Sequence, residues 1–274
     1  MQNELKIGFI GGGNMAAALI GGLAGKLADG AHIHVVDINA DNLQRLQASF
    51  GVSTAQQADA ALAGCDVIVL AVKPQQMREV AAQLLPQLAS QLILSIAAGI
   101  RAVDLSRWLG GHQAIVRCMP NTPALIGQGI AGMAALPGVT PAQRAAANAI
   151  MQAVGATVWL DDEALIDPVT AVSGSGPAYV FYFIEAMQQA AQELGLTPQQ
   201  GIALAKATFT GAAMLAAQSE EPVSLLRERV TSKGGTTHAA LTSMEADGVK
   251  AAIVRAVKAA SARGKEMGEE FGRD

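Results

Sequence analysis

The sequence is poor in charged and aromatic residues. Charged residues make up only 15% of its 274 positions and aromatic residues only 4%, although 51% are hydrophobic. In an ordinary globular protein about a quarter of the residues are charged. So little charge indicates that much of the surface is buried, part of it between subunits. Alanine and glycine supply much of the hydrophobicity, and such small residues let helices approach one another closely.

Other absences exclude whole classes of function. Lys and Arg form no dense basic patch and the net charge is −4, so nucleic acid is not an expected partner. No run of about 18 apolar residues is free of both glycine and charge, so no membrane span is expected. The chain enters a strand without a charged leader or a cleavage site. Its two cysteines, Cys65 and Cys118, lie in apolar runs typical of buried, reduced thiols. We therefore expect a cytoplasmic protein.

The first half of the chain alternates between strands and helices. Apolar runs predict strands at Lys6–Ile10, His32–Ile38 and Asp66–Val72, and two more in LILSIAAG and AIVRCMP. Continuous apolar runs are typical of parallel strands that are covered on both faces. This order predicts a Rossmann domain, an α/β fold with a doubly wound, mostly parallel sheet.

The second half of the chain changes character near Leu160. Strand-like runs end there and long helical runs follow, one of them starting with the capping pattern TPQQ at residues 197–200. We expect a dinucleotide-binding domain at residues 1–160 and an all-α domain at residues 161–274. Runs such as YVFYFIEAMQQAA have too few polar positions for a helix that faces water, which predicts an obligate dimer through these helices. The Gly-, Arg- and Glu-rich tail after Ser261 is expected to fray.

A glycine-rich turn follows the first predicted strand. Residues 7–16, IGFIGGGNMA, contain the pattern G-x-G-x-x-A and lead directly into a helix. Gly11 would allow the tight turn and Gly13 would admit a pyrophosphate to the backbone. Asn14 and Met15 open the helix, whose N-terminus offers amide donors. The motif predicts a dinucleotide cofactor, and a glycine-rich turn without a ligand is the alternative.

Asp37 ends the next predicted strand, where the ribose-binding acid of such proteins is found. A carboxylate there accepts hydrogen bonds from ribose hydroxyls and repels a 2′-phosphate. The residues that follow it, Ile38-Asn39-Ala40, supply no arginine to hold that phosphate. The residues alone therefore favour NAD over NADP. The alternative is that Asp37 only caps the turn that follows it.

Further cofactor contacts are expected in the loops that end later strands, because ligands of such sheets lie at the carboxyl ends of the strands. Lys73 would contact a phosphate or a ribose, and a solvated lysine is the alternative. The candidate residues are Ala71, Val72, Lys73 and Pro74 in AVKP, Ala97 in SIAAG, and Asn121 and Pro123 in MPNTP.

Two loops in the second half carry a family resemblance. Val172–Tyr179 reads VSGSGPAY and Thr231–Leu241 reads TSKGGTTHAAL. Together with FIGGGNMA, AVKP and MPNTP, in the same order, they resemble the pyrroline-5-carboxylate reductases over essentially the whole chain. The resemblance implies a Rossmann domain and a helical domain that interlocks with a second copy, giving a homodimer or a larger assembly. It also implies the last step of proline biosynthesis, in which 1-pyrroline-5-carboxylate is reduced to L-proline with NADPH or NADH.

The resemblance places the substrate at the second of these loops, on Ser232, Gly234, Gly235, Thr236 and Thr237. Backbone amides of the loop would hold the substrate carboxylate, and the Thr237 hydroxyl would contact the ring nitrogen as the catalytic group. The alternative is that the threonines cap the helix HAALTSME. Both roles are compatible, because a helix N-terminus itself binds anions.

Two other functional classes are compatible with a Rossmann fold. Hydroxyacid dehydrogenases of a similar two-domain build use a lysine on a helix of the substrate domain. Here the helix after SGSGPAY contains Glu185 and no lysine, and Lys206 comes one predicted helix later. This absence favours imine over carbonyl chemistry. A nucleotide sensor without turnover would not need a second loop for a small anion.

His32 and His34 share a strand face without further ligands nearby in the sequence, so no metal is expected.

Overall fold

The computed structural model of this protein describes residues 5–24 and 27–273. Contacts between residues divide the chain into two compact units, one formed by Met1–Ser175 with Ala260–Asp274 and the other by Gly176–Ala259. The domain boundary expected near Leu160 stays a prediction. The two units are compact groups of contacting residues, and the first of them also includes the C-terminal residues.

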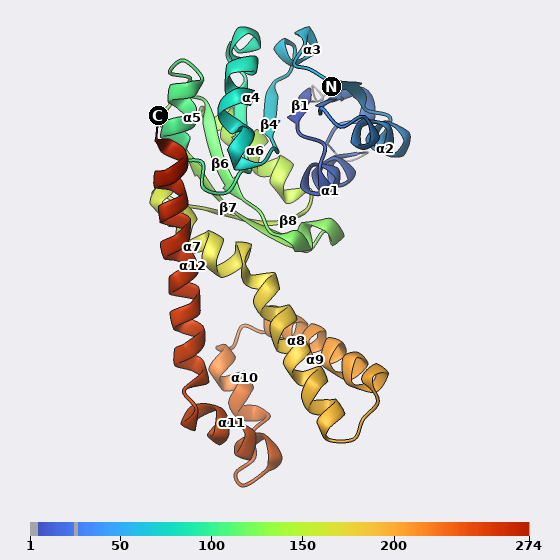
Figure 1. Ribbon diagram of the computed structural model, residues 1–274, viewed down its shortest axis with the longest axis vertical. Helices are drawn as coiled ribbons and strands as arrows, with labels where there is room; N and C mark the ends of the chain where they lie inside the picture. The colour runs from blue at the N-terminus through green and yellow to red at the C-terminus, as the bar shows by residue number, and fades with distance from the viewer. Residues whose placement is uncertain (1–4, 25–26, 274) are drawn as a thin grey trace. The chain divides into compact units, whose positions relative to one another are not determined.

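The first unit (Figure 1) is built on a sheet. This sheet has eight strands in the order β3-β2-β1-β4-β5-β6-β7-β8. Every neighbouring pair is parallel except β6 and β7. This confirms the predicted doubly wound, mostly parallel sheet. The chain leaves β1 toward β2 and β3 and then returns to β4 on its other side, so the direction of winding changes beside β1. The strands are β1 Ile7–Ile10, β2 Ile33–Val36, β3 Ser53–Ala55, β4 Val67–Leu70, β5 Leu92–Ser95, β6 Ile115–Met119, β7 Gly129–Ala135 and β8 Gly155–Trp159.

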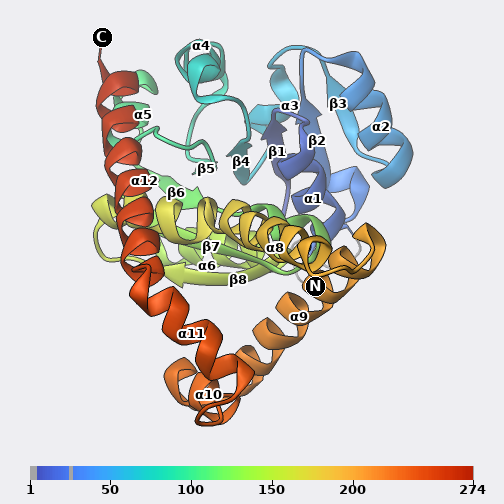
Figure 2. The same ribbon diagram turned by 60° about the horizontal axis from the view of Figure 1, so that its bottom comes forward.

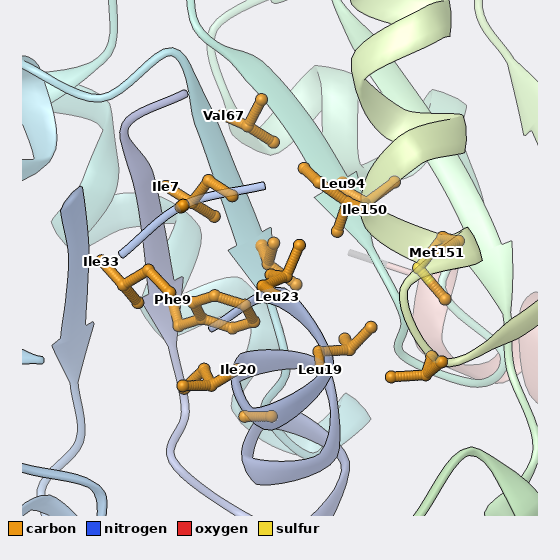
Figure 3. Packing of buried hydrophobic residues seen from close by; sticks show 14 of the residues in the cluster. Ile7, Phe9, Leu19, Ile20, Leu23, Ile33, Val67, Leu94, Ile150 and Met151 are labelled. Carbon is orange, nitrogen blue, oxygen red and sulfur yellow. The ribbon is translucent and has the colours of Figure 1, made fainter. Parts of the chain in front are cut away.

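Helices cover both faces of this sheet. Alternate residues of each strand point to opposite faces, so the strands contribute side chains to two separate cores. Ile7 and Phe9 of β1 lie in one core with Leu19 and Ile20 (Figure 3). Ile10 lies in the other core. Burying each of these large side chains contributes roughly 1.5–3 kcal/mol. The helices of this unit are α1 Asn14–Leu23, α2 Ala40–Phe50, α3 Ala60–Ala63, α4 Met77–Leu84, α5 Ala102–Trp108, α6 Pro141–Gln152 and α7 Ile166–Val169.

A buried ion cluster joins β6 to the segment that begins α7. The Arg117 side chain is only 4% exposed, and its guanidinium lies 3.0 Å from the Glu163 carboxylate and 3.4 Å from that of Asp167. The same Glu163 oxygen accepts the backbone N–H of Ala102 at 2.7 Å, which adds the start of α5 to the cluster. A buried arginine is tolerated here because both of its neighbours carry the opposite charge.

The second unit consists of helices with little interior of their own. Helices α8 Gly176–Glu193 and α9 Pro198–Gln218 form a hairpin (Figure 2), and Gly201 lets α9 approach the Ala191 side chain. The capping box predicted at residues 197–200 is confirmed, with Thr197 and Gln200 bonded reciprocally. Helices α10 Val223–Arg229 and α11 Thr236–Ala246 follow, and α12 Val249–Gly272 continues into the first unit. None of the helices in the described part of the chain is long and apolar enough to cross a membrane.

Apolar side chains remain uncovered along these helices. Large hydrophobic residues of α8 and α9 are exposed in the single chain, among them Val180, Phe181, Tyr182, Leu204, Met214 and Leu215. A water-facing helix normally carries a polar face. Such an uncovered apolar surface is typical of a segment that packs against another protein surface.

The C-terminal end of α12 is held in the first unit, beside α5 (Figures 1 and 2). Arg107 donates to the carbonyl oxygen of Gly272 at 2.7 Å, and Arg101 donates to that of Lys265 at 3.3 Å. The Phe271 ring packs against the core that contains Ile10. The expectation that the tail after Ser261 frays was wrong, because α12 continues to Gly272 and arginines bind its terminal carbonyls.

Candidate active site

The glycine loop connects β1 to α1 and leaves open space at one position. Gly11 has a φ of +100°, and a Cβ there would lie 2.5 Å from the carbonyl oxygen of Ala71, so only glycine fits. Gly13 caps α1 without a side-chain hydrogen bond, and a Cβ built on it meets no atom within 4 Å. The first amides of a helix have no partner within the helix. The loop therefore presents free space and N–H donors together, which fits the pyrophosphate of a dinucleotide.

Asp37 follows β2 and is bound to the same loop. Its carboxylate accepts the N–H of Gly12 at 2.6 Å and the N–H of Asn39 at 2.8 Å, and the Asn42 amide donates to it at 3.2 Å. Asn39 itself caps α2, through the N–H groups of Asp41 and Asn42. Asp37 therefore caps the turn after β2, which was the alternative to a role in ribose binding. Each carboxylate oxygen accepts more than one bond, so the same group can also accept from a ribose hydroxyl.

A cleft of about 240 Å³ lies at the carboxyl ends of β1, β2 and β4. It brings together Gly11, Gly13, Asp37, Ala71, Val72 and Lys73, all of them predicted as cofactor residues. The sequence prediction missed the glutamines that complete its lining, Gln56, Gln57, Gln76 and Gln83. Gln56 and Gln57 follow β3, a strand that was not predicted. Had β3 been recognised, the position of ligands at strand ends would have identified both residues.

The remaining predicted cofactor residues lie outside the lining of this cleft. Asn14 and Met15 start α1, and Pro74 starts a 3-10 turn, Pro74–Gln76. Ala97 is buried in the loop after β5. Their roles stay predictions.

Asn121 and Pro123 lie in the loop after β6. The Asn121 side chain is buried, donates to the carbonyl oxygen of Ser173 at 3.1 Å and accepts the N–H of Ile130 at 3.0 Å. Pro123 lies in the 3-10 turn Thr122–Ile126 that follows. The Asn121 amide is thus engaged in holding backbone, and the direct cofactor contact predicted for it stays a prediction.

The loop TSKGGTT connects α10 to α11 in the second unit. Gly234 has a φ of +73°, and the N–H of Gly235 closes a turn on the carbonyl oxygen of Ser232 at 3.0 Å. The positive φ of Gly234 favours glycine there, and a Cβ on Gly235 would lie 2.5 Å from the Ser232 hydroxyl, which would have to move away. The loop ends where α11 begins, and it therefore presents helix amides to solvent.

Thr236 and Thr237 occupy the first turn of α11 rather than its cap. Gly235 is the N-cap, and no side chain caps the helix. The interpretation in which the threonines cap this helix was therefore wrong, because Thr236 is the first residue after the N-cap and lies inside the helix. Thr236 is exposed and Thr237 is half-buried. Their hydroxyls lie next to amides that have no intrahelical partner, an arrangement that suits a small anion with a polar group beside it.

The cysteines are not part of either loop. Cys65 and Cys118 are free and buried, as predicted. Burial raises the pKa of the Cys65 thiol to about 11 and also raises that of Cys118. A thiol becomes a nucleophile only as the thiolate, so neither group is suited to nucleophilic catalysis at neutral pH.

Two family models match the chain. Residues 163–267 match the model described as pyrroline-5-carboxylate reductase dimerisation. Residues 6–99 match the model described as NADP oxidoreductase, coenzyme F420-dependent. The two matches correspond to the helical part of the chain and to the half of the sheet that carries the glycine loop.

Curated proteins and solved structures resemble the chain over nearly its full length. The pyrroline-5-carboxylate reductase of Pseudomonas aeruginosa is 47% identical over 97% of this chain and 98% of its own length. That of Escherichia coli (strain K12) is 38% identical over 93% of this chain and 95% of its own. The structure of a pyrroline-5-carboxylate reductase from Coxiella burnetii is 39% identical, covers 97% of this chain and 99% of its own, and has a TM-score of 0.91. The structure of Plasmodium falciparum pyrroline carboxylate reductase with NADP bound is 31% identical, with coverages of 98% and 99% and a TM-score of 0.86.

Proposed function

The chain belongs to the pyrroline-5-carboxylate reductase family, and we propose how its residues carry out the family's reaction. That reaction is the NAD(P)H-dependent reduction of the C=N bond of 1-pyrroline-5-carboxylate, which gives L-proline in the last step of proline biosynthesis. The observation that carries the proposal is that α1 and α11 both begin at a glycine N-cap with no side-chain cap, which leaves amides at each helix start for an anion.

The first site suits the cofactor. The amides at Gly13 and the start of α1 bind the pyrophosphate, and Asp37 accepts from a ribose hydroxyl. Lys73, in the loop after β4, binds a phosphate or the second ribose. Ala97 and the loop at Asn121 and Pro123, which lie outside the lining of the cleft, would supply further cofactor contacts at the carboxyl ends of β5 and β6. The bound cofactor supplies a hydride.

The second site suits the substrate. Its carboxylate accepts hydrogen bonds from the amides of Gly234, Thr236 and Thr237, with the Ser232 hydroxyl beside them, because the N–H of Gly235 is already bound to the carbonyl oxygen of Ser232. A hydrogen bond to a charged acceptor is worth roughly 1.5–3 kcal/mol, so two or three of them fix the ring. Thr236 and Thr237 place hydroxyls next to this carboxylate, and Thr237 contacts the ring nitrogen.

The chemistry requires orientation more than a strong acid. The hydride adds to the imine carbon, and the C=N π electrons move to nitrogen. When the imine enters protonated it already carries the proton that the amine product keeps, so no group of the enzyme must transfer one. Thr237 then aligns the nitrogen and its carbon, and alignment of this kind supplies a large part of a rate enhancement. The absence of lysine from α8 fits this chemistry, because no carbonyl oxygen has to be protonated.

Self-association and location complete the proposal. The uncovered apolar side chains of α8 and α9 fit a homodimer, or a larger assembly built from it. A folded monomer in sedimentation experiments at micromolar concentration would refute the obligate dimer. The free cysteines fit the reducing cytoplasm.

The test is to follow the absorbance of the reduced nicotinamide with 1-pyrroline-5-carboxylate, and with a 2-oxo acid as the competing carbonyl substrate. We expect turnover with the imine alone. Turnover with only the 2-oxo acid would indicate a hydroxyacid dehydrogenase. Cofactor binding without turnover of either substrate would indicate a nucleotide sensor.

A further inference from the structure

We propose that the cofactor cleft selects NADH over NADPH, with Asp37 as the residue that rejects the 2′-phosphate, a selectivity that rests on the proposed function. NADPH differs from NADH only by a phosphate on the 2′-hydroxyl of the adenosine ribose. The preference is therefore decided at the end of the cleft formed by the turn after β2.

The Asp37 carboxylate is held in place by backbone at two points. The N–H of Gly12, inside the glycine loop, donates to one oxygen, and the N–H of Asn39 donates to the other. The side chain therefore cannot turn away from an incoming phosphate without leaving both N–H groups unpaired, which is costly. A carboxylate accepts hydrogen bonds from ribose hydroxyls. It has no proton to give to a phosphate oxygen, and the two anions repel each other.

Neutral residues surround this carboxylate. Ile38, the next residue, is 79% exposed. Gln56, Gln57 and Gln83 line the cleft and also a neighbouring hollow of about 550 Å³ that Ile38 borders. Their amides can bind the uncharged edges of adenine and ribose. A 2′-phosphate is normally held by arginine or lysine, and none stands among the described residues that line this hollow.

The cations nearby serve other positions. Lys73 is the cation in the lining of the cleft, but it follows β4, which β1 separates from β2. Two strand spacings amount to roughly 10 Å, which places the backbone of Lys73 far from the ribose end. Arg45, on α2, donates to the Asn42 side chain at 3.4 Å and is not part of the lining. Among the described residues that line the ribose end of the cleft, Asp37 is therefore the charged one.

The test measures kcat/KM for NADH and for NADPH at saturating 1-pyrroline-5-carboxylate. Two charges about 4 Å apart near a protein surface interact strongly enough that we expect a preference for NADH of roughly tenfold or more. Asp37→Asn and Asp37→Ser should each reduce that preference by a similar factor, mainly through a lower KM for NADPH. Asp41→Ser is the matched control: Asp41 is an exposed carboxylate in the first turn of α2 that does not line the cleft. It should leave the ratio unchanged within about twofold.

Several outcomes would overturn the proposal. A wild-type preference for NADPH refutes it directly. An equal effect of Asp41→Ser would mean that the overall field of the domain selects the cofactor and that Asp37 does not. If the Asp37 variants fail to fold, Ile38→Arg tests the same point, because Ile38 is exposed: the added cation should raise the affinity for NADPH and leave that for NADH unchanged.

Measurements of cofactor binding and of turnover separate the cofactor selectivity from the reductase function. The Kd of each reduced cofactor is measured by fluorescence on the same wild-type protein. Turnover of the imine with NADPH preferred would leave the reductase function intact and refute the selectivity. Tighter binding of NADH without turnover of the imine would support the selectivity and refute the reductase function.

Discussion

Replacing Gly11 or Gly13 with alanine adds one methyl group to the same loop, and we expect different consequences at the two positions. At Gly11, where φ is +100°, the new Cβ would lie 2.5 Å from the oxygen and 2.7 Å from the carbon of the Ala71 carbonyl group. At Gly13, where φ is −70°, it would meet nothing within 4 Å. Gly11→Ala therefore strains the fold, whereas Gly13→Ala fills the space that we assign to the pyrophosphate.

The free energy of unfolding should fall by about 2–6 kcal/mol in Gly11→Ala. A side chain in this backbone region costs about 1–3 kcal/mol, and overpacking against the end of β4 costs about 1–3 kcal/mol more. For Gly13→Ala the change should stay below about 1 kcal/mol. Alanine is a slightly poorer helix cap than glycine, and the loss is offset because alanine lowers the entropy of the unfolded chain.

Urea unfolding measures the first effect and cofactor titration the second. Both tryptophans, Trp108 and Trp159, lie in the first unit, so their fluorescence reports on the part of the chain that carries the loop. Gly11→Ala should unfold at a lower urea concentration. Gly13→Ala should unfold like the wild type, but its KM for NADH should rise roughly tenfold or more, the equivalent of one lost hydrogen bond to a charged acceptor.

Two results would refute this reasoning. Wild-type cofactor affinity in Gly13→Ala would mean that the pyrophosphate does not approach the open side of Gly13. Wild-type stability in Gly11→Ala would mean that the turn can move away from Ala71, and that glycine is present there for another reason.

Three more expectations concern single residues. Thr237→Ala should lower kcat with little change in the Kd of the cofactor, and Thr237→Ser should keep more activity; unchanged turnover in Thr237→Ala removes this hydroxyl from the mechanism. Arg117→Met should lower the free energy of unfolding, measured in urea, by about 3–5 kcal/mol, because Glu163 and Asp167 lose their buried cation. A loss below about 1 kcal/mol would mean that these ion pairs stabilise the fold no more than exposed ion pairs do. Alkylation of Cys65 by iodoacetamide at pH 8 should be roughly a hundredfold slower than that of free cysteine, because the pKa of this thiol is raised to about 11. The rate of alkylation should increase with each pH unit up to that value. A rate that stays constant between pH 8 and 10 would contradict the raised pKa.

Residues with a strong local preference made much of the fold predictable. The run VIVL gave β4 because four consecutive apolar residues form a strand that is buried on both faces. Strands β7, with the sequence GIAGMAA, and β8, with GATVW, were not predicted. Strand β8 contains Thr, Val and Trp, which favour strands, but it is only five residues long. Glycine and alanine make up most of β7 and have little preference for strands, so partners in the sheet decide its conformation. The tail after Ser261 was misjudged for the same reason, since arginines far away in the sequence stabilise it.

The candidate site divides along the same line. The glycine loop, Asp37 and the AVKP segment were predicted because each follows a strand that the sequence reveals. Gln56 and Gln57 were missed because β3, only three residues long, has no visible pattern. The alternative in which the threonines cap α11 was wrong, and only the backbone geometry places the N-cap at Gly235.

The family, the glycine loop, the parallel strands and the order of the two halves of the chain could be predicted from the sequence, because they follow from local patterns and from motifs at fixed spacing. Only folding shows which residues share the cleft at the ends of β1, β2 and β4, that the N–H of Gly12 holds Asp37, and that the end of α12 is bound to the first unit. These features depend on contacts between residues far apart in the chain. No local pattern encodes them, because they form only when packing brings such segments together.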